Sequence, residues 1–116
     1  MTTGARRIVR QPAIDVLAKA MTEDQLQDAI TGMCDHLRIK WHHETDSRKS
    51  KAGFPDLVLC GRRVAFWELK SQGGRVRPEQ NEWLTAILRA EFGQARVVRP
   101  MDLLNGSVQE WLRALR

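Results

Sequence analysis

The chain has 116 residues, of which 42% are hydrophobic, so it has the size of one domain with one core and little room for a second. Nineteen Lys and Arg against fourteen Asp and Glu give a formal charge of +5, which favours a polyanion such as nucleic acid as the partner, although a basic surface alone does not require one. The sequence has no apolar run long enough to span a bilayer and no secretory signal, and its two cysteines, Cys34 and Cys60, are expected in the core; we therefore expect a cytoplasmic protein with no membrane partner.

The first part of the chain divides into a basic N-terminal arm, residues 1–20, and a folded domain, residues 21–116. Pro12 precedes an apolar-rich stretch, residues 13–20, that we expect to form a short helix. The arginines at the start of the arm could contact phosphates, and partial disorder is the commoner state of such a terminus. The sequence does not decide between these two interpretations.

A clear helix is predicted from Thr22, because Thr22 and Gln25 have the spacing of a capping box. An apolar stripe at helical spacing follows: Leu26, Ile30, Met33 and Leu37. At about 100° per residue, Glu23 falls about 60° from Leu26 and therefore near this stripe. Glu23 can look toward the core side, but an acidic residue in a first turn also stabilises the helix dipole without any catalytic role.

The middle of the chain predicts three strands. Residues 39–43 alternate well enough for a short strand, and a polar loop with three basic side chains follows: Arg48, Lys49 and Lys51. This loop could track a phosphate backbone, and the ordinary alternative is a solvated loop. Two apolar runs, residues 57–60 and 64–69, then predict a β-hairpin around Gly61.

The last third of the chain predicts a helix, a strand and a final helix. A proline suits the first turn of a helix over residues 78–92, and an apolar face at helical spacing is expected to be buried: Trp83, Leu84, Ile87, Leu88 and Phe92. Pro100 stops a strand over residues 95–99, and Ser107 with Glu110 has the spacing of a second capping box. The predicted order is therefore helix, three strands, helix, strand and helix.

Charged side chains interrupt the buried strands of the hairpin at Asp56, Glu68 and Lys70, although burying an unpartnered charge is expensive. Side chains alternate along a strand, so Glu68 and Lys70 point the same way. A three-residue hairpin loop places Asp56 opposite Glu68, whereas a two-residue turn, which Gly61 also suits, places it opposite Trp67 on the other face. We prefer the three-residue loop because it gathers all three charges, although the turn chemistry does not decide the register.

Two carboxylates that face each other across a hairpin repel, and a divalent cation between them is the natural reason to keep both. Oxygen-only ligation favours Mg²⁺ or Mn²⁺ over zinc, and Mg²⁺ needs only one or two protein carboxylates. Asp56 and Glu68 are thus predicted metal ligands for an ion that would activate water for attack on a phosphodiester. Lys70 would position that water or neutralise the phosphate, and Glu23 could add a carboxylate.

The segments GFPDLVL (residues 53–59) and FWELK (residues 66–70) resemble the paired motifs of the PD-(D/E)XK nuclease superfamily. Within it, the nearest resemblance is to the virus-type replication-repair nuclease domain, or VRR-NUC domain. The resemblance extends to the early acidic helix, to residues 71–84 and to residues 97–100. It implies an α/β fold of the restriction-endonuclease-like type, an αβββαβ core with a mixed central sheet flanked by helices.

The resemblance also implies a catalytic set in this chain: Glu23, Asp56, Glu68, Lys70 and Gln80. It makes Asp56 and Glu68 ligands of Mg²⁺ or Mn²⁺ and adds the backbone carbonyl of Leu69. Gln80 corresponds to the motif glutamine, and its place on the apolar face of its helix favours a role in orienting Lys70 or a phosphate; otherwise it is a polar residue at a helix start. Basic residues that flank the motifs are candidates for DNA contact: Arg48, Lys49, Lys51, Arg75 and Arg77.

From the resemblance we expect a Mg²⁺-dependent endodeoxyribonuclease that acts on branched DNA such as a Holliday junction, as a homodimer, in a bacterial or phage-infected cell. A protein this small offers limited surface for a branched substrate, which separately favours a two-fold dimer. One alternative is a non-catalytic DNA-binding module on the same fold, against which the intact motif residues speak. Another is an interaction protein with a surface of tryptophans, although their spacing favours core packing for most: Trp41, Trp67, Trp83 and Trp111.

Overall fold

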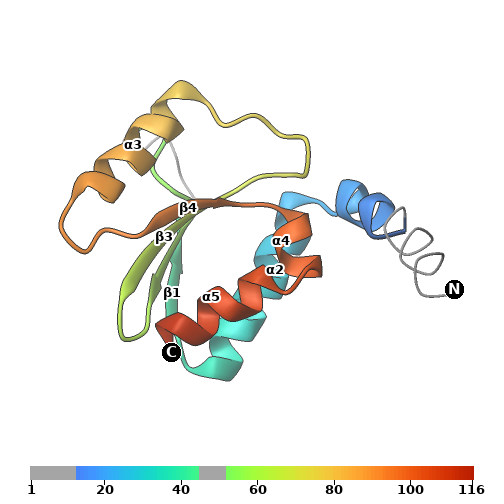
Figure 1. Cartoon of the computed structure of the whole chain (residues 1–116), viewed down its shortest axis with the longest axis horizontal. Coiled ribbons are helices and arrows are strands. Elements are labelled where there is room, and N and C mark those ends of the chain that lie inside the picture. The colour runs from blue at the N-terminus through green and yellow to red at the C-terminus, as the bar shows by residue number, and fades with distance from the viewer. Residues whose placement is uncertain (1–12, 45–51) are drawn as a thin grey trace, which may run out of the picture.

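The computed structural model describes residues 13–44 and 52–116 and has the expected mixed α/β fold (Figure 1). Its elements are α2 (Glu23–Leu37), β1 (Lys40–His43), β2 (Leu57–Cys60), β3 (Val64–Leu69), α3 (Pro78–Arg89), β4 (Ala95–Val98), α4 (Pro100–Leu104) and α5 (Ser107–Leu115). Residues 13–20 are also helical, as predicted. The start of the arm and most of the loop between β1 and β2 lie outside the described residues. None of the described helices combines the length and the apolar character that crossing a lipid bilayer requires.

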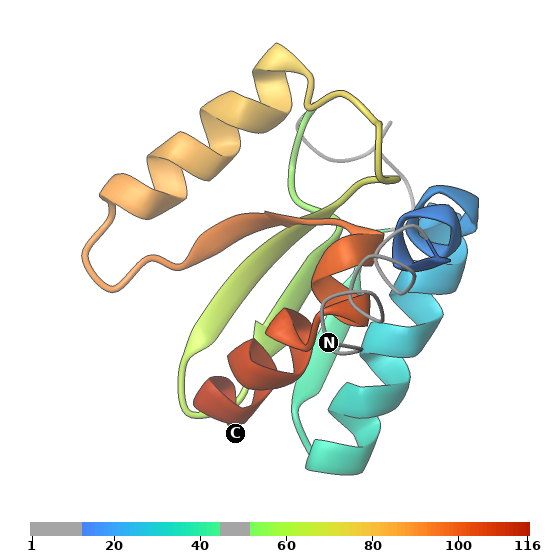
Figure 2. The same ribbon diagram turned by 45° about the vertical axis from the view of Figure 1, so that its right-hand side comes forward.

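The described strands form one four-stranded sheet in the order β1-β2-β3-β4. β1, β2 and β3 are antiparallel neighbours, and β4 runs parallel to β3 after a crossover through α3, so the sheet is mixed. α3 lies over one face of the sheet, and α2, α4 and α5 lie over the other (Figures 1 and 2). The helix at residues 13–20 stands beside this body rather than over the sheet (Figure 1).

The β2–β3 hairpin has the three-residue loop that we preferred from the sequence, because Cys60 pairs with Val64 and Val58 pairs with Phe66. The loop is docked on the end of α5, where the backbone N–H of Arg62 donates a hydrogen bond to the carbonyl oxygen of Leu115 at 2.6 Å. A Cβ atom at Gly61 would collide with that same oxygen. Glycine at position 61 therefore allows the close approach of the hairpin loop to the end of α5.

Side-chain alternation on β3 divides the molecule into two layers. Ala65, Trp67 and Leu69 are buried on the side of α2 and α5, where they join the main core. Residues of α2, β2, β4 and α5, with one residue before β1, complete this core: Leu26, Ile30, Cys34, Ile39, Leu57, Leu59, Val98, Val108, Leu112 and Leu115. The other face of β3, which carries Phe66 and Glu68, looks toward α3. The charged residues of the hairpin thus lie on the α3 face.

The start of α2 is confirmed in detail. The Thr22 hydroxyl accepts a hydrogen bond from the Gln25 N–H at 3.1 Å, and the Gln25 side chain accepts one from the Thr22 N–H at 2.9 Å. Leu26 and Ile30 of the predicted stripe are fully buried. Local hydrogen bonding and helical periodicity agree here, so the prediction succeeds.

The predicted end of α3 is wrong. The helix ends at Arg89, and Leu88 and Phe92, which we expected in the buried face, are 58% and 90% exposed. The chain turns at Phe92, which has a φ of 64°, and brings Gly93 so close to the carbonyl of Ile87 that a Cβ atom there would collide with it. The apolar spacing continued past the point where tertiary packing ends the helix.

Two smaller expectations fail, and one helix was missed. Ser107 does not cap α5: the N-cap is Gly106 with a φ of 88°, a conformation that glycine adopts readily, and no side-chain cap bond forms. Cys60 is exposed rather than buried, since it ends β2 next to the hairpin loop, whereas Cys34 is in the core. Pro100 follows the end of β4, as expected, but it is also the first residue of α4, a helix that the sequence did not reveal.

Replacing Gly61 by alanine should lower the free energy of unfolding by about 1–3 kcal/mol, because the added methyl forces the hairpin away from α5. The matched control is Gly32→Ala, inside α2, where a Cβ atom meets nothing within 4 Å. This control should be neutral or stabilise the protein by up to about 1 kcal/mol. Chemical denaturation measures both variants, and equal effects would contradict the docking of the hairpin.

Candidate active site

The candidate site lies on the α3 face of the sheet, where β2 begins and β3 ends. Asp56 directly precedes β2, Glu68 lies near the end of β3, and Lys70 follows that strand. The register that pairs Leu57 with Trp67 places Asp56 beside Glu68 on the neighbouring strand. The structure therefore brings together the three charged residues that the sequence singled out.

Glu68 is the most constrained of these residues, with 1% of its surface exposed. Its Oε2 atom accepts a hydrogen bond from Gln80 Nε2 at 2.9 Å and lies 3.5 Å from Lys70 Nζ. Its Oε1 atom is buried and has no hydrogen-bond partner among the described residues. A buried carboxylate oxygen without a partner is costly, and a cation is the group that would satisfy it best.

Asp56 is held against the end of β3 by its own carboxylate. Its Oδ2 atom accepts a hydrogen bond from the backbone N–H of Leu69 at 2.8 Å. This bond explains how a residue outside the regular pairing of β2 keeps a fixed place next to Glu68. It also ties Asp56 to Leu69, the residue whose carbonyl oxygen was expected as a third metal ligand.

The electrostatics of the pair favour a bound cation. Burial of Glu68, followed by the charge and hydrogen bonding of Asp56, raises the pKa of Glu68 from its ordinary 4.5 to about 8, and Lys70 offsets part of that rise. A divalent cation would add positive charge at the point where two carboxylates now repel each other. The donor set, two carboxylates with one oxygen left unpartnered, therefore fits Mg²⁺ or Mn²⁺.

Gln80 has a different partner from the one that we expected. It is buried at the third position of α3, where its Oε1 atom accepts a hydrogen bond from the Arg77 N–H at 2.8 Å and its Nε2 atom donates to Glu68. One amide therefore caps the helix and holds the glutamate, whereas the sequence suggested Lys70 or a phosphate as its target. Because α3 lies over the sheet, the side chain that caps its first turn also lies within hydrogen-bond distance of Glu68.

The segment before Asp56 sets how closely α3 approaches the sheet. Gly53 has a φ of 87°, and a Cβ atom there would collide with the backbone of Glu79 in the first turn of α3. Phe54 packs edge-on against Phe66 and Trp83, at centroid distances of 6.1 and 5.1 Å. Backbone contact and aromatic packing together fix the first turn of α3 over the site.

Arg99 is a residue that sequence reasoning missed. Its Nη1 atom donates hydrogen bonds to the carbonyl oxygens of Ser71, Gln72 and Gly74, at 2.8, 3.3 and 2.8 Å. It therefore ties together the loop that follows Lys70. Its position directly after β4 was the signal in the sequence that could have identified it. Because β3 and β4 are parallel, their carboxyl ends meet at the edge of the sheet that carries the site, and a residue that follows β4 lies near that edge.

Glu23 does not join the carboxylate pair. It is exposed in the first turn of α2, next to the N-cap. Among the residues that the structure describes, no group of three or more His, Cys, Asp and Glu side chains is arranged to hold a metal. The metal site supported by direct geometry therefore consists of Asp56 and Glu68.

The candidate DNA-contacting residues are only partly described. Arg75 and Arg77 are exposed in the loop between β3 and α3, and Arg77 Nε lies 3.8 Å from Glu79 Oε1. The remaining three fall outside the described residues: Arg48, Lys49 and Lys51. Of the candidate DNA-contacting segments, the structure therefore describes only the loop between β3 and α3.

The raised pKa of Glu68 predicts how stability depends on pH in the metal-free protein. The folded state keeps this carboxyl protonated up to about pH 8, whereas the unfolded chain loses the proton near 4.5, so stability should fall as pH rises through this interval. The slope should approach at most about 1.4 kcal/mol per pH unit. Denaturation in EDTA should show this fall, and Glu68→Gln should remove most of it. An equally steep fall in the variant would contradict the assignment to Glu68.

The sequence model of the VRR-NUC domain family matches residues 6–101, which include all the candidate catalytic residues. A solved structure described as a VRR_NUC domain protein is similar with a TM-score of 0.63 at 23% identity, and the alignment covers 82% of this chain and 91% of that one. This structural likeness shows the shared fold. No curated protein matches the chain.

Proposed function

The chain belongs to the VRR-NUC domain family, a family of nucleases, and we propose that it is a Mg²⁺- or Mn²⁺-dependent DNA endonuclease with its active site at Asp56, Glu68 and Lys70. The observation that carries this proposal is the pair of carboxylates formed by the buried Glu68 and the partly buried Asp56, in which one oxygen of Glu68 has no partner among the described residues. A structural ion pair would have no reason to place a second carboxylate beside Glu68.

Asp56 and Glu68 would hold the ion, and water would complete its coordination, with the Leu69 carbonyl as a further candidate donor and Glu23 contributing through water. When bound, the ion supplies Lewis acidity for phosphodiester hydrolysis. Mg²⁺ typically keeps several waters and uses one or two protein carboxylates, which agrees with a two-carboxylate site. The chain's own contribution is to fix these ligands before the substrate arrives.

Gln80 and Lys70 share one oxygen of Glu68, and this sharing gives each a role. The Gln80 amide holds Oε2 at 2.9 Å and so leaves Oε1 as the oxygen available to the ion, which makes Gln80 a positioning residue. The Lys70 side chain is 12% exposed, so its ammonium group can reach both Glu68 and a substrate. It would hold the attacking water or neutralise the scissile phosphate.

The substrate that we propose is branched DNA, bound by basic residues on both sides of the motifs. Arg75 and Arg77 would contact phosphates from the described loop, and the loop before Asp56 would add three more cations: Arg48, Lys49 and Lys51. A homodimer would place two such sites about a two-fold axis and supply the paired cuts that resolve a junction. Sedimentation in the presence and absence of DNA tests this assembly.

The parent protein should cut labelled branched DNA in Mg²⁺, and EDTA should stop the reaction. Glu68→Gln should lower the rate by about a hundredfold or more, since the loss of about 3 kcal/mol of transition-state stabilisation has that effect. Glu91→Gln makes the same chemical change at an exposed position in the turn after α3 and should keep the parent rate.

Linear duplexes of the same sequence, assayed in parallel, test the preference for branches. Equal rates for Glu68→Gln and Glu91→Gln would contradict the active site. Tight DNA binding by a parent that never cleaves would instead identify a non-catalytic DNA-binding module.

A further inference from the structure

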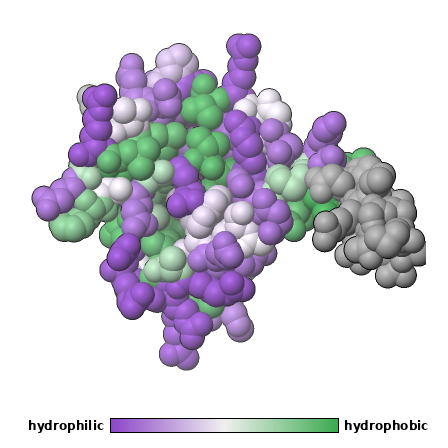
Figure 3. Space-filling view, in the orientation of Figure 1, coloured by the Kyte–Doolittle hydropathy of each residue, from purple (hydrophilic) through white to green (hydrophobic). Residues whose placement is uncertain are grey.

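The end of the molecule away from the site carries a group of basic side chains that the proposed function does not use. All are exposed, and they come from the end of α2, the start of β1, the hairpin loop and the end of α5: Arg38, Lys40, Arg62, Arg63, Arg113 and Arg116. We name this surface the basic pole. In the space-filling view, this lower end of the molecule is largely hydrophilic (Figure 3).

Backbone contacts bring these separate segments to one place. Lys40 pairs with Cys60, the residue that directly precedes the hairpin loop. The loop is joined to the end of α5 through the hydrogen bond from Arg62 to Leu115. The basic pole is therefore a defined part of the folded structure and is not a coincidence of flexible tails.

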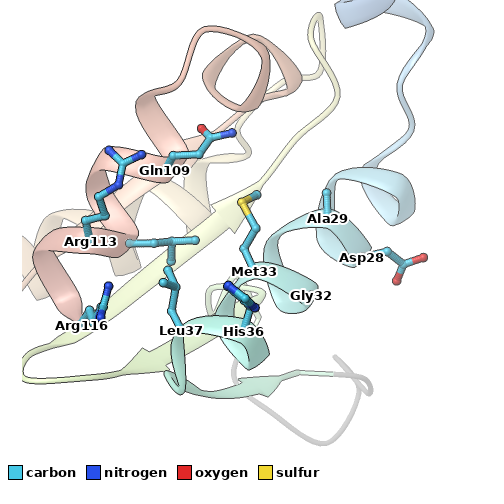
Figure 4. Close-up of a pocket in the computed structure, with 10 residues that line it drawn as sticks. Asp28, Ala29, Gly32, Met33, His36, Leu37, Gln109, Arg113 and Arg116 are labelled. Carbon is cyan, nitrogen blue, oxygen red and sulfur yellow. The ribbon is translucent and has the colours of Figure 1, made fainter.

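The surface of the basic pole is hollowed between the ends of α2 and α5. A cavity of about 270 Å³ is lined by His36, Leu37, Arg38 and Arg116. It adjoins a groove of about 470 Å³, with His36 on the α2 side and Arg113 and Arg116 on the α5 side (Figure 4). Guanidinium groups on the wall of a concave surface are suited to phosphate, which they can bind through two parallel hydrogen bonds.

These cations are not neutralised within the described part of the chain. None of the six forms an ion pair there. Asp35, the acidic residue adjacent to them in sequence, accepts a hydrogen bond from the Trp41 indole N–H at 2.9 Å. Six exposed cations outnumber the acidic residues placed near them, Asp35 and the groove residue Asp28, so the surface keeps an excess of positive charge and a polyanion is the partner that it fits.

The basic pole is too far from the active site to act on the same phosphates. Arg63 precedes Glu68 by five residues of extended chain, a separation of roughly 17 Å at 3.3 Å per residue. Charges act over a screening length of about 8 Å at physiological ionic strength. The pole would therefore contact phosphates other than the one that is cut.

We propose that the basic pole binds the phosphate backbone of nucleic acid at a distance from the phosphate that is cut. This inference rests on the proposed function for the identity of the polyanion. Phosphates of one strand are about 3.4 Å apart along a duplex, so a pole roughly 17 Å from Glu68 would contact the backbone about five base pairs away from the active site. The pole thereby extends the DNA-binding surface beyond the loops that flank the motifs.

The test compares two double variants with equal changes of charge. Arg63→Glu with Arg113→Glu alters the pole, and Lys19→Glu with Arg89→Glu alters exposed cations elsewhere. Binding of a four-way DNA junction is measured by fluorescence anisotropy in EDTA over a series of salt concentrations. Loss of two phosphate contacts should reduce the slope of log K against log salt by about 2 in the pole variant. The control variant should keep nearly the parent slope.

An unchanged slope in the pole variant, or equal losses of junction binding in both variants, would overturn the proposal. So would a parallel assay in which the pole variant loses binding only to vesicles that contain phosphatidylserine and not to the junction. Far-UV circular dichroism checks folding, and Arg63→Gln with Arg113→Gln replaces the pole variant if charge reversal unfolds it. Because binding is measured without metal, the outcome is separate from catalysis. A junction that is bound through the pole but never cut in Mg²⁺ would refute the proposed function alone.

Discussion

Two carboxylates, those of Asp56 and Glu68, stand beside each other across one hairpin, and one of them is almost completely buried. Such a pair is unfavourable unless the surrounding chain holds it and a cation balances it. The structure supplies the holding groups: a backbone N–H for Asp56, and an amide and an ammonium group for one oxygen of Glu68. The remaining oxygen of Glu68 has no partner among the described residues, and it is the atom to which we assign metal binding.

The fold reaches this arrangement in successive steps. The three-residue loop sets the register of β2 and β3, the register decides which side chains face α3, and the loop is held against the end of α5. Gly53 then lets the first turn of α3 approach closely enough for its amide cap to reach Glu68. The same docking gathers cations at the opposite end of the molecule. One hairpin therefore organises both the site and the basic pole.

Local patterns predicted what local forces decide. The two hairpin strands were predicted with their exact ends, because alternation and the flanking turn residues are contained within the segment itself. The α2 cap was also predicted, and the register was preferred correctly for its effect on three charges. Tertiary contacts decided the rest: the end of α3, the cap of α5 and the presence of α4 depend on neighbours that are distant in sequence.

The site was predicted in the same uneven way. Its charged residues were visible because charges are rare inside apolar strands, but the partner of Gln80 and the bonds of Arg99 required the crossover through α3. The most direct test of the account is a crystal structure with Mn²⁺, using anomalous scattering to locate the ion. We expect one ion bound by Glu68 Oε1 and by Asp56, with Gln80 still on Oε2. Manganese elsewhere, or none between these two side chains, would contradict the account.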